Sequence, residues 1–182
     1  MKVTPLKIPD ILLIEPTIFE DRRGFFFESF NEVEFSRITS LDVLFVQDNH
    51  SKSYKGVLRG LHYQLPPYGQ GKLVRVIQGE IFDVVVDIRR ASPTFGQYIF
   101  NILSADNKKQ VWIPEGFAHG FLTLSHTSEL LYKVTNFYRP ENERCILWND
   151  VTLDIDWPKN LDIKLSPRDL MGQHFNVSEL FT

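Results

Sequence analysis

The chain contains 182 residues, of which 43% are hydrophobic and 13% aromatic, so it can bury a core and is not an intrinsically disordered chain. Its formal net charge of -3 at pH 7 lacks the excess of Lys and Arg that binding to nucleic-acid backbones needs. Cys145 is the one cysteine, which excludes an intrachain disulfide, and no apolar run is long enough to span a bilayer. We therefore expect a soluble, cytoplasmic protein without nucleic-acid or membrane partners.

Short runs rich in Val, Ile, Phe and Tyr, separated by Gly, Pro, Asn and Asp, follow one another along most of the chain. They predict strands over residues 24–30, 43–48, 57–64, 72–78, 80–87, 98–103, 110–113, 120–124, 129–136 and 145–148. After the strand 72–78, Gly79 allows a tight bend. The consecutive valines Val84, Val85 and Val86 indicate a strand that is buried on both faces.

Helical signals are weak. Residues 31–38 begin with Asn31 as an N-cap residue and form two turns at most, and residues 169–175 are compatible with a short turn. No repeat, low-complexity block or linker divides the sequence, so we expect one domain over residues 1–182. Many short strands with almost no helix favour an all-β sandwich or barrel over βαβ units.

The usual nucleotide and cofactor motifs are missing from the sequence. There is no G-x-G-x-x-G pattern, and residues 66–73 fail the P-loop pattern because Pro66 replaces the first glycine and Leu73 follows Lys72. A Rossmann nicotinamide site is therefore not indicated, and we expect no cofactor.

Two segments carry histidines in a recognisable setting. Gly56 is followed after five residues by His62, and Pro114, Gly116 and His119 form Pro-x-Gly-x-x-His. These segments resemble the two short motifs of the cupin superfamily, which implies a small jelly-roll β-barrel. The superfamily's metal site opens with His-x-His, whereas Gln64 stands at the second histidine here. Zinc and iron usually take at least three protein ligands, so the sequence predicts no metal.

A narrower resemblance covers the chain from Phe19 to Asp169. It rests, in order, on DRRGFFFE (21–28), FVQDNHS (45–51), LRGLH (58–62), QGKLVR (70–75), SPTFG (92–96), WIPEGFAHG (112–120) and WND (148–150). Together these segments are similar to the dTDP-4-dehydrorhamnose 3,5-epimerase family. The resemblance implies conversion of dTDP-4-dehydro-6-deoxy-D-glucose to dTDP-4-dehydro-L-rhamnose in dTDP-L-rhamnose biosynthesis, by a cofactor-independent isomerase that acts as a homodimer.

The resemblance also implies catalytic roles for individual residues. Protons at C3 and C5 are acidic because they flank the C4 ketone, so inversion needs a base on one face, an acid on the other and a donor near the enolate oxygen. By resemblance His62 is the base, Asp169 orients it, Tyr132 is the acid and Lys72 stabilises the enolate. Tyr132 taken alone would be read as a half-buried strand tyrosine.

Binding of the sugar nucleotide is implied for a second group of residues. Arg23 and Arg59 match diphosphate contacts, for which guanidinium groups are suited. Tyr138 matches an aromatic ring that stacks on the thymine. The remaining matches are polar contacts to nucleotide or sugar, and they comprise Glu28, Gln47, Asn49, His119, Glu143 and Arg168.

Three other functions stay open at this point. One is a relative that epimerises only C3 or only C5, or that isomerises a related dTDP-linked keto-sugar. Another is a non-catalytic cupin that binds sugar nucleotides, which would be expected to lose His62 or Tyr132. The third is a metal-dependent cupin isomerase or dioxygenase, against which the missing third ligand speaks.

Overall fold

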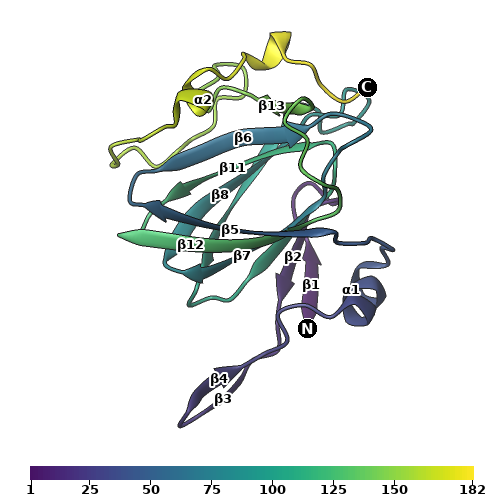
Figure 1. Cartoon of the computed structure of the whole chain (residues 1–182), viewed down its shortest axis with the longest axis vertical. Coiled ribbons are helices and arrows are strands. Elements are labelled where there is room, and N and C mark those ends of the chain that lie inside the picture. The colour runs from purple at the N-terminus through teal and green to yellow at the C-terminus, as the bar shows by residue number, and fades with distance from the viewer.

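The computed structural model describes residues 1–182, and it consists almost entirely of antiparallel sheets. The six-stranded sheet has the order β1-β2-β10-β7-β12-β5 and the five-stranded sheet the order β13-β6-β11-β8-β9. These two sheets face each other as in a jelly roll, while the two-stranded sheet β3-β4 stands apart (Figure 1). The expected all-β cupin-type fold with a few short helices is confirmed.

The strands of the six-stranded sheet are β1 (Lys2–Pro5), β2 (Leu12–Glu15), β10 (Gln110–Ile113), β7 (Lys72–Gln78), β12 (Thr127–Val134) and β5 (Gln47–Tyr54). Those of the five-stranded sheet are β13 (Glu143–Cys145), β6 (Leu58–Gln64), β11 (Phe117–Thr123), β8 (Glu80–Asp87) and β9 (Tyr98–Ser104). The remaining elements are β3 (Phe19–Asp21), β4 (Gly24–Phe26), the helices α1 (Glu32–Thr39) and α2 (Pro167–Leu170), and a 3-10 turn, Phe175–Val177.

Three inner strands have the predicted bounds, whereas β11 begins three residues and β12 two residues earlier than predicted. β7, β8 and β10 have the predicted bounds, and Gly79 makes the bend between β7 and β8 at φ +75°. β1, β2 and β3 were not predicted, and the strand expected over 24–30 ends at Phe26. The strand expected over 145–148 ends at Cys145, because the chain then turns towards the C-terminal segment.

The strand β5 covers Gln47–Tyr54 instead of the predicted residues 43–48. The apolar run 43–48 lies mostly before β5, whose sequence is the polar QDNHSKSY. It is nevertheless a strand, because it pairs with β12 residue by residue from Gln47 to Tyr54. Its inward side chains face the pocket described below rather than a core, so no apolar alternation marks it.

The helices are short, as expected. In α1 the side chain of Asn31 accepts a hydrogen bond from the backbone N–H of Glu34, which caps the first turn. The turn expected over 169–175 is instead split, because α2 ends at Leu170 and the 3-10 turn begins at Phe175.

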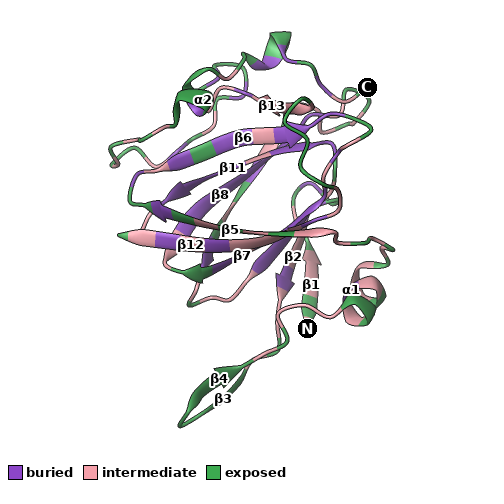
Figure 2. Ribbon diagram, in the orientation of Figure 1, coloured by how far each residue is buried: buried purple, intermediate pink, exposed green.

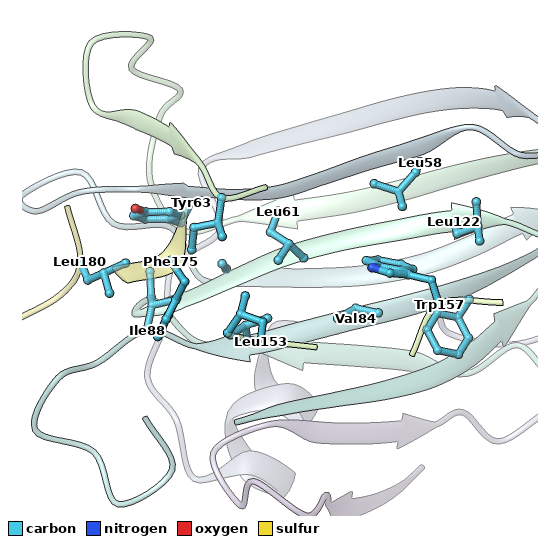
Figure 3. Close-up of a cluster of buried hydrophobic side chains, with 14 of the residues drawn as sticks. Leu58, Leu61, Tyr63, Val84, Ile88, Leu122, Leu153, Trp157, Phe175 and Leu180 are labelled. Atoms are coloured by element: carbon cyan, nitrogen blue, oxygen red, sulfur yellow. The ribbon is translucent and has the colours of Figure 1, made fainter. Parts of the chain in front are cut away.

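The strand β8 is buried on both faces, as its valines predicted. Ile81 and Val85 pack against Val74 and Val111 of the opposite sheet. Val84 and Val86 belong instead to a second cluster, in which the C-terminal residues Leu153, Trp157, Phe175 and Leu180 cover the five-stranded sheet (Figure 3). The inner strands β8 and β11 of the five-stranded sheet are thus packed on both faces, and Figure 2 shows them mostly buried.

The β3-β4 hairpin lacks such support. It projects away from the barrel with all its residues exposed (Figures 1 and 2). The exposed fractions of Phe19, Phe25 and Phe26 are 63%, 59% and 66%. No helix in the chain has both the length and the apolar character needed to cross a membrane.

Candidate active site

A pocket of about 300 Å³ is lined by strands of both larger sheets. It gathers most of the residues predicted for the site, namely Gln47, Asn49, Arg59, His62, Lys72, His119, Tyr132, Tyr138 and Glu143. These residues are spread over nearly a hundred positions of the sequence. They meet because β5, β12 and β7 are neighbours in one sheet and β6, β11 and β13 are neighbours in the other.

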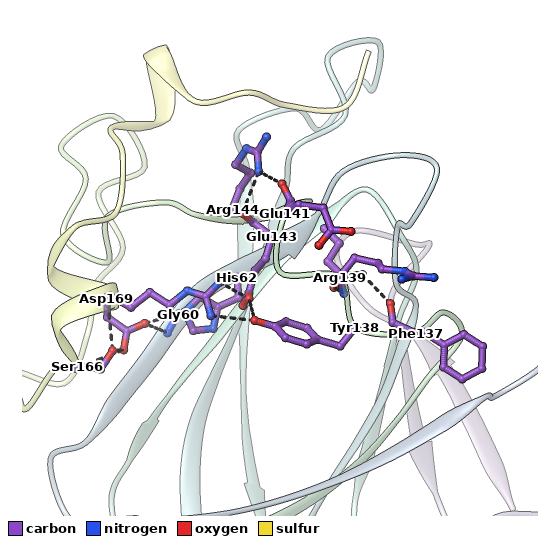
Figure 4. Close-up of polar contacts among 12 residues, drawn as sticks. Gly60, His62, Phe137, Tyr138, Arg139, Glu141, Glu143, Arg144, Ser166 and Asp169 are labelled. Atoms are coloured by element: carbon purple, nitrogen blue, oxygen red, sulfur yellow. Dashed lines mark hydrogen bonds and ion pairs between the residues drawn. The ribbon is translucent and has the colours of Figure 1, made fainter.

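His62 forms a pair with Asp169 at one side of the pocket. Its Nε2 lies 2.7 Å from Oδ1 of Asp169, and its Nδ1 makes no hydrogen bond within the chain (Figure 4). Asp169 sits in the first turn of α2, where it forms a capping box with Ser166, and it accepts a further hydrogen bond from the N–H of Gly60. Burial alone would raise the pKa of Asp169, but its hydrogen bonds outweigh burial and lower the pKa to about 2. The carboxylate therefore stays ionised and holds the imidazole in place.

His119 forms a similar pair with Asp83 beside it on the same sheet. Its Nε2 lies 2.6 Å from Oδ1 of Asp83, and His119 stands directly opposite His62 in the pairing of β11 with β6. Asp83 is fully buried, and its Oδ2 has no partner. We did not predict Asp83 from the sequence, although a charge within the apolar run Ile81-Phe82-Asp83-Val84 was an available signal.

The strands β6 and β11 come unusually close to each other at Gly60 and Gly120. Gly60 has φ +125°, and a Cβ atom there would lie 2.5 Å from the Cα of Gly120. Only glycine fits such a position, because other residues would clash with the facing backbone. The register shifts between His119 and Phe121 at the same place.

Lys72 and Tyr132 approach the pocket from the six-stranded sheet. Burial lowers the pKa of Lys72 to about 8, against the opposing effect of Glu143 and Asp83. The Lys72 ammonium donates to the backbone carbonyl of His62 at 3.2 Å. Burial raises the pKa of Tyr132, so its hydroxyl remains protonated near neutral pH. That hydroxyl makes no hydrogen bond within the chain, which leaves it free for a ligand.

Tyr138 belongs to a polar cluster at the mouth of the pocket. Its hydroxyl donates to Glu143 at 2.6 Å and accepts from Arg168 at 3.2 Å, while Arg168 also forms an ion pair with Glu143 (Figure 4). Nearby, Arg59 is held by Oγ of Ser53 at 3.0 Å and by the carbonyl of Lys52 at 3.1 Å. The cluster combines cations with a partly exposed aromatic ring.

Comparison with known proteins agrees with this arrangement. The family profile described as dTDP-4-dehydrorhamnose 3,5-epimerase matches residues 5–176. The chain belongs to the dTDP-4-dehydrorhamnose 3,5-epimerase family. The enzymes of that name from Shigella flexneri and Pseudomonas aeruginosa are 56% and 57% identical to it over 181 residues, which cover 100% of this chain and 99% of theirs. The family and the isomerase assignment predicted from the sequence are confirmed.

Solved structures of this family are similar along the whole fold. The dTDP-6-deoxy-D-glucose-3,5-epimerase of Legionella pneumophila, in complex with dTDP-4-keto-L-rhamnose, gives a TM-score of 0.95 at 49% identity and covers 98% of this chain and 94% of its own. A 3'-monoepimerase of Streptomyces bikiniensis, in complex with dTDP-quinovose, gives a TM-score of 0.90 at 34% identity, with 94% and 87% covered. The fold therefore occurs in epimerases that differ in the number of carbons they invert.

Four predicted epimerase residues do not line the pocket. Asp169 and Arg168 contact the lining residues His62 and Tyr138, whereas Arg23 and Glu28 lie away from it. Arg23 lies at the turn of the β3-β4 hairpin, where it pairs with Asp21 at 2.6 Å. Glu28 follows the hairpin and accepts a hydrogen bond from Asn31 at 3.2 Å. Because the hairpin projects from the barrel (Figure 1), the chain does not bring these two residues to its own pocket.

One group of potential metal ligands converges beside the epimerase pocket. Donor atoms of His62, Cys145 and Asp169 lie within 4.8 Å of one another. Cys145 stands opposite His62 across the β13-β6 pair, which explains its proximity. Burial raises the pKa of its thiol to about 12, so the thiolate that a metal needs is disfavoured, and His62 and Asp169 are hydrogen-bonded to each other. The group does not have the character of a structural metal site.

Proposed function

We propose that this chain inverts C3 and C5 of dTDP-4-dehydro-6-deoxy-D-glucose and releases dTDP-4-dehydro-L-rhamnose, a step of dTDP-L-rhamnose biosynthesis. One observation carries the proposal: a histidine paired with an ionised carboxylate, a protonated tyrosine and a buried lysine face one pocket, in a member of this epimerase family. That set supplies the base, the acid and the oxyanion stabiliser that the reaction needs.

The reaction begins at His62. Its unbonded Nδ1 takes the proton from C3 or C5, and Asp169 stabilises the resulting imidazolium through its hydrogen bond with Nε2. The electron pair left by the C–H bond becomes the enolate, with its negative oxygen at C4. Lys72 stabilises that oxygen as an ammonium, and His119 donates a hydrogen bond to the sugar.

Tyr132 completes the inversion. Its phenol gives a proton to the opposite face of the carbon, the enolate collapses back to the C4 ketone, and the configuration at that carbon is inverted. Water then reprotonates Tyr132 and removes the proton from His62. Every step moves protons only, so the reaction consumes no redox cofactor.

The nucleotide binds at the mouth of the pocket. Arg59 contacts the diphosphate, the ring of Tyr138 stacks on the thymine, and Gln47 and Asn49 contact the nucleotide and sugar. Glu143 and Arg168 orient Tyr138 through its hydroxyl. This division separates recognition from the proton transfers deeper in the pocket.

A homodimer would explain why Arg23 and Glu28, predicted as binding residues, lie away from the pocket of their own chain. The β3-β4 hairpin exposes three phenylalanines and carries Arg23 beyond the barrel, which suits insertion next to the pocket of a second copy. Co-expression of Arg23→Ala with His62→Ala tests this. A mixed dimer then contains one pocket with intact His62 and the partner subunit's intact Arg23, and it regains activity that neither variant has. If light scattering shows a mixed dimer but activity is not recovered, Arg23 does not complete the pocket of the second copy.

We expect residues 1–182 to act as one epimerase unit in the cytoplasm, without metal. The match over residues 5–176 supports the single unit, and a lone unpaired cysteine suits a reducing compartment.

The deciding experiment is incubation with dTDP-4-dehydro-6-deoxy-D-glucose in deuterated water, followed by NMR and mass spectrometry. Deuterium at both C3 and C5 is the expected result. Deuterium at only one carbon would make the chain a monoepimerase. This is the alternative suggested by its similarity to the 3'-monoepimerase of Streptomyces bikiniensis. Absence of exchange at both would leave a sugar-nucleotide-binding protein without this activity.

A further inference from the structure

The segment from Asn136 to Arg139, which carries Tyr138, is held in an unusual way. It follows β12 without regular secondary structure, and the backbones of Asn136, Phe137 and Tyr138 make no hydrogen bonds to other backbone groups. Such a segment would ordinarily be mobile, since each ordered residue costs conformational entropy of about 1–2 kcal/mol.

Glutamine side chains bond all four residues of the segment. Gln70 donates to the carbonyl of Asn136 at 2.8 Å, and Gln47 accepts from the N–H of Tyr138 at 3.1 Å. Gln64 donates to the carbonyl of Phe137 at 3.2 Å and accepts from the N–H of Arg139 at 2.7 Å. We refer to Gln47, Gln64 and Gln70 as the glutamine clamp.

Gln64 is the central member of the glutamine clamp. It exposes only 3% of its surface and does not line the pocket, so it cannot act by touching the substrate. A third hydrogen bond, from its Nε2 to the carbonyl of Tyr68 at 2.7 Å, fixes the amide in one orientation. Gln64 also stands where the cupin motif places its second metal-binding histidine. The position is thus turned from the pocket towards the segment beside it.

We propose that Gln64 is a positioning residue for nucleotide recognition: through the glutamine clamp it preorders residues 136–139, so that Tyr138 meets the base without first losing backbone freedom. The inference rests on the proposed function, in which Tyr138 stacks on thymine. Two anchors then fix the ring, with the backbone held by the glutamine clamp and the hydroxyl held by Glu143 and Arg168. Preordering of this kind improves affinity without a new contact.

The test is a double-mutant cycle between Gln64→Met and Tyr138→Ala, read out by calorimetric binding of dTDP and by steady-state kinetics. Gln64→Met keeps the side-chain length and removes all three hydrogen bonds. In the otherwise unchanged protein we expect dTDP to bind about tenfold more weakly, which corresponds to about 1.4 kcal/mol, with KM raised equally and kcat changed less than about twofold. In the Tyr138→Ala background the same substitution should weaken binding less than about twofold.

Two controls keep the outcomes separate. Gln78→Met, at the exposed end of β7, removes an amide that bonds only to Thr127 and should leave dTDP binding unchanged. If Gln64→Met does not fold, Gln70→Met removes one bond of the glutamine clamp, and a weakening of about threefold should vanish in the same cycle. Additive effects in the cycle, or a fall in kcat with unchanged dTDP affinity, would overturn the inference. If Tyr138→Ala itself binds dTDP normally, the proposed stacking is wrong instead.

Discussion

Two histidine–carboxylate pairs lie side by side on the five-stranded sheet, and they differ in what surrounds them. The side chain of His62 is 28% exposed, and its partner Asp169 is held by Ser166 and by the N–H of Gly60. The side chain of His119 is 11% exposed, and its partner Asp83 is fully enclosed with one oxygen unpartnered. An accessible imidazole with a well-supported carboxylate can exchange protons with a substrate. An enclosed pair is better suited to a fixed hydrogen bond, so the same two residue types serve two tasks.

Removing the imidazoles gives the largest expected contrast. His62→Ala should lower kcat by about 10³-fold or more, since it removes the base, while dTDP binds nearly as before. His119→Ala should lower kcat/KM by only about 10- to 100-fold, the usual effect of losing one hydrogen bond to a charged group. Deuterium exchange at C3 and C5 measures the loss of catalysis, and calorimetry measures dTDP binding. Equal losses in both variants would show that the two pairs share one task.

Changing the carboxylates sharpens the comparison. Asp169→Asn should lower kcat by about 10²- to 10³-fold, because an amide that donates to Nε2 forces the proton onto Nδ1, the nitrogen that must act as base. Asp83→Asn should lower kcat/KM by about tenfold or less. Single-turnover kinetics of both variants would measure this difference in rate loss. A larger loss for Asp83→Asn would exchange the roles assigned to the two pairs.

The pH dependence of the rate tests Lys72, which approaches the two pairs from the six-stranded sheet. The Lys72 ammonium has a pKa of about 8, so kcat should fall as pH rises through about 8 and the charge near the enolate is lost. Lys72→Arg stays charged and should flatten that limb, although the absolute rate will differ. A wild-type alkaline limb that persists unchanged in Lys72→Arg must come from another group.

The smallest expected effect concerns stability in acid. The pKa of Asp169 is about 2 in the folded chain against an ordinary value of 3.8. Its contribution of about 2 kcal/mol is therefore present above pH 3.8 and disappears as pH falls through about 2. Urea unfolding of the wild type and Asp169→Asn should show a difference at neutral pH that closes in this window. A constant difference would mean that the substitution acts through packing.

The inner strands and the motif histidines could be predicted from the sequence, because apolar runs bounded by Gly and Pro encode β7, β8 and β10 directly. β5 was displaced because its inward face lines a polar pocket and carries no apolar signal. Asp83 was missed because it lies in an apolar strand far from any motif, and its partner is known only once β8 and β11 pair. The separation of Arg23 from the pocket was equally hidden, since motif order says nothing about which side of the molecule a hairpin reaches.

The close approach of Gly60 and Gly120 sets a limit on how this protein can be altered. The distance between the imidazoles of His62 and His119 depends on the absence of side chains at Gly60 in β6 and Gly120 in β11. A methyl group at position 60 would force the two strands apart. Such a change would leave every pocket side chain in the sequence yet move His62 relative to His119 within the five-stranded sheet. Mutant libraries that vary only the residues touching the sugar therefore change the chemistry on an unchanged backbone. The spacing of that backbone is set by the absence of side chains at Gly60 and Gly120.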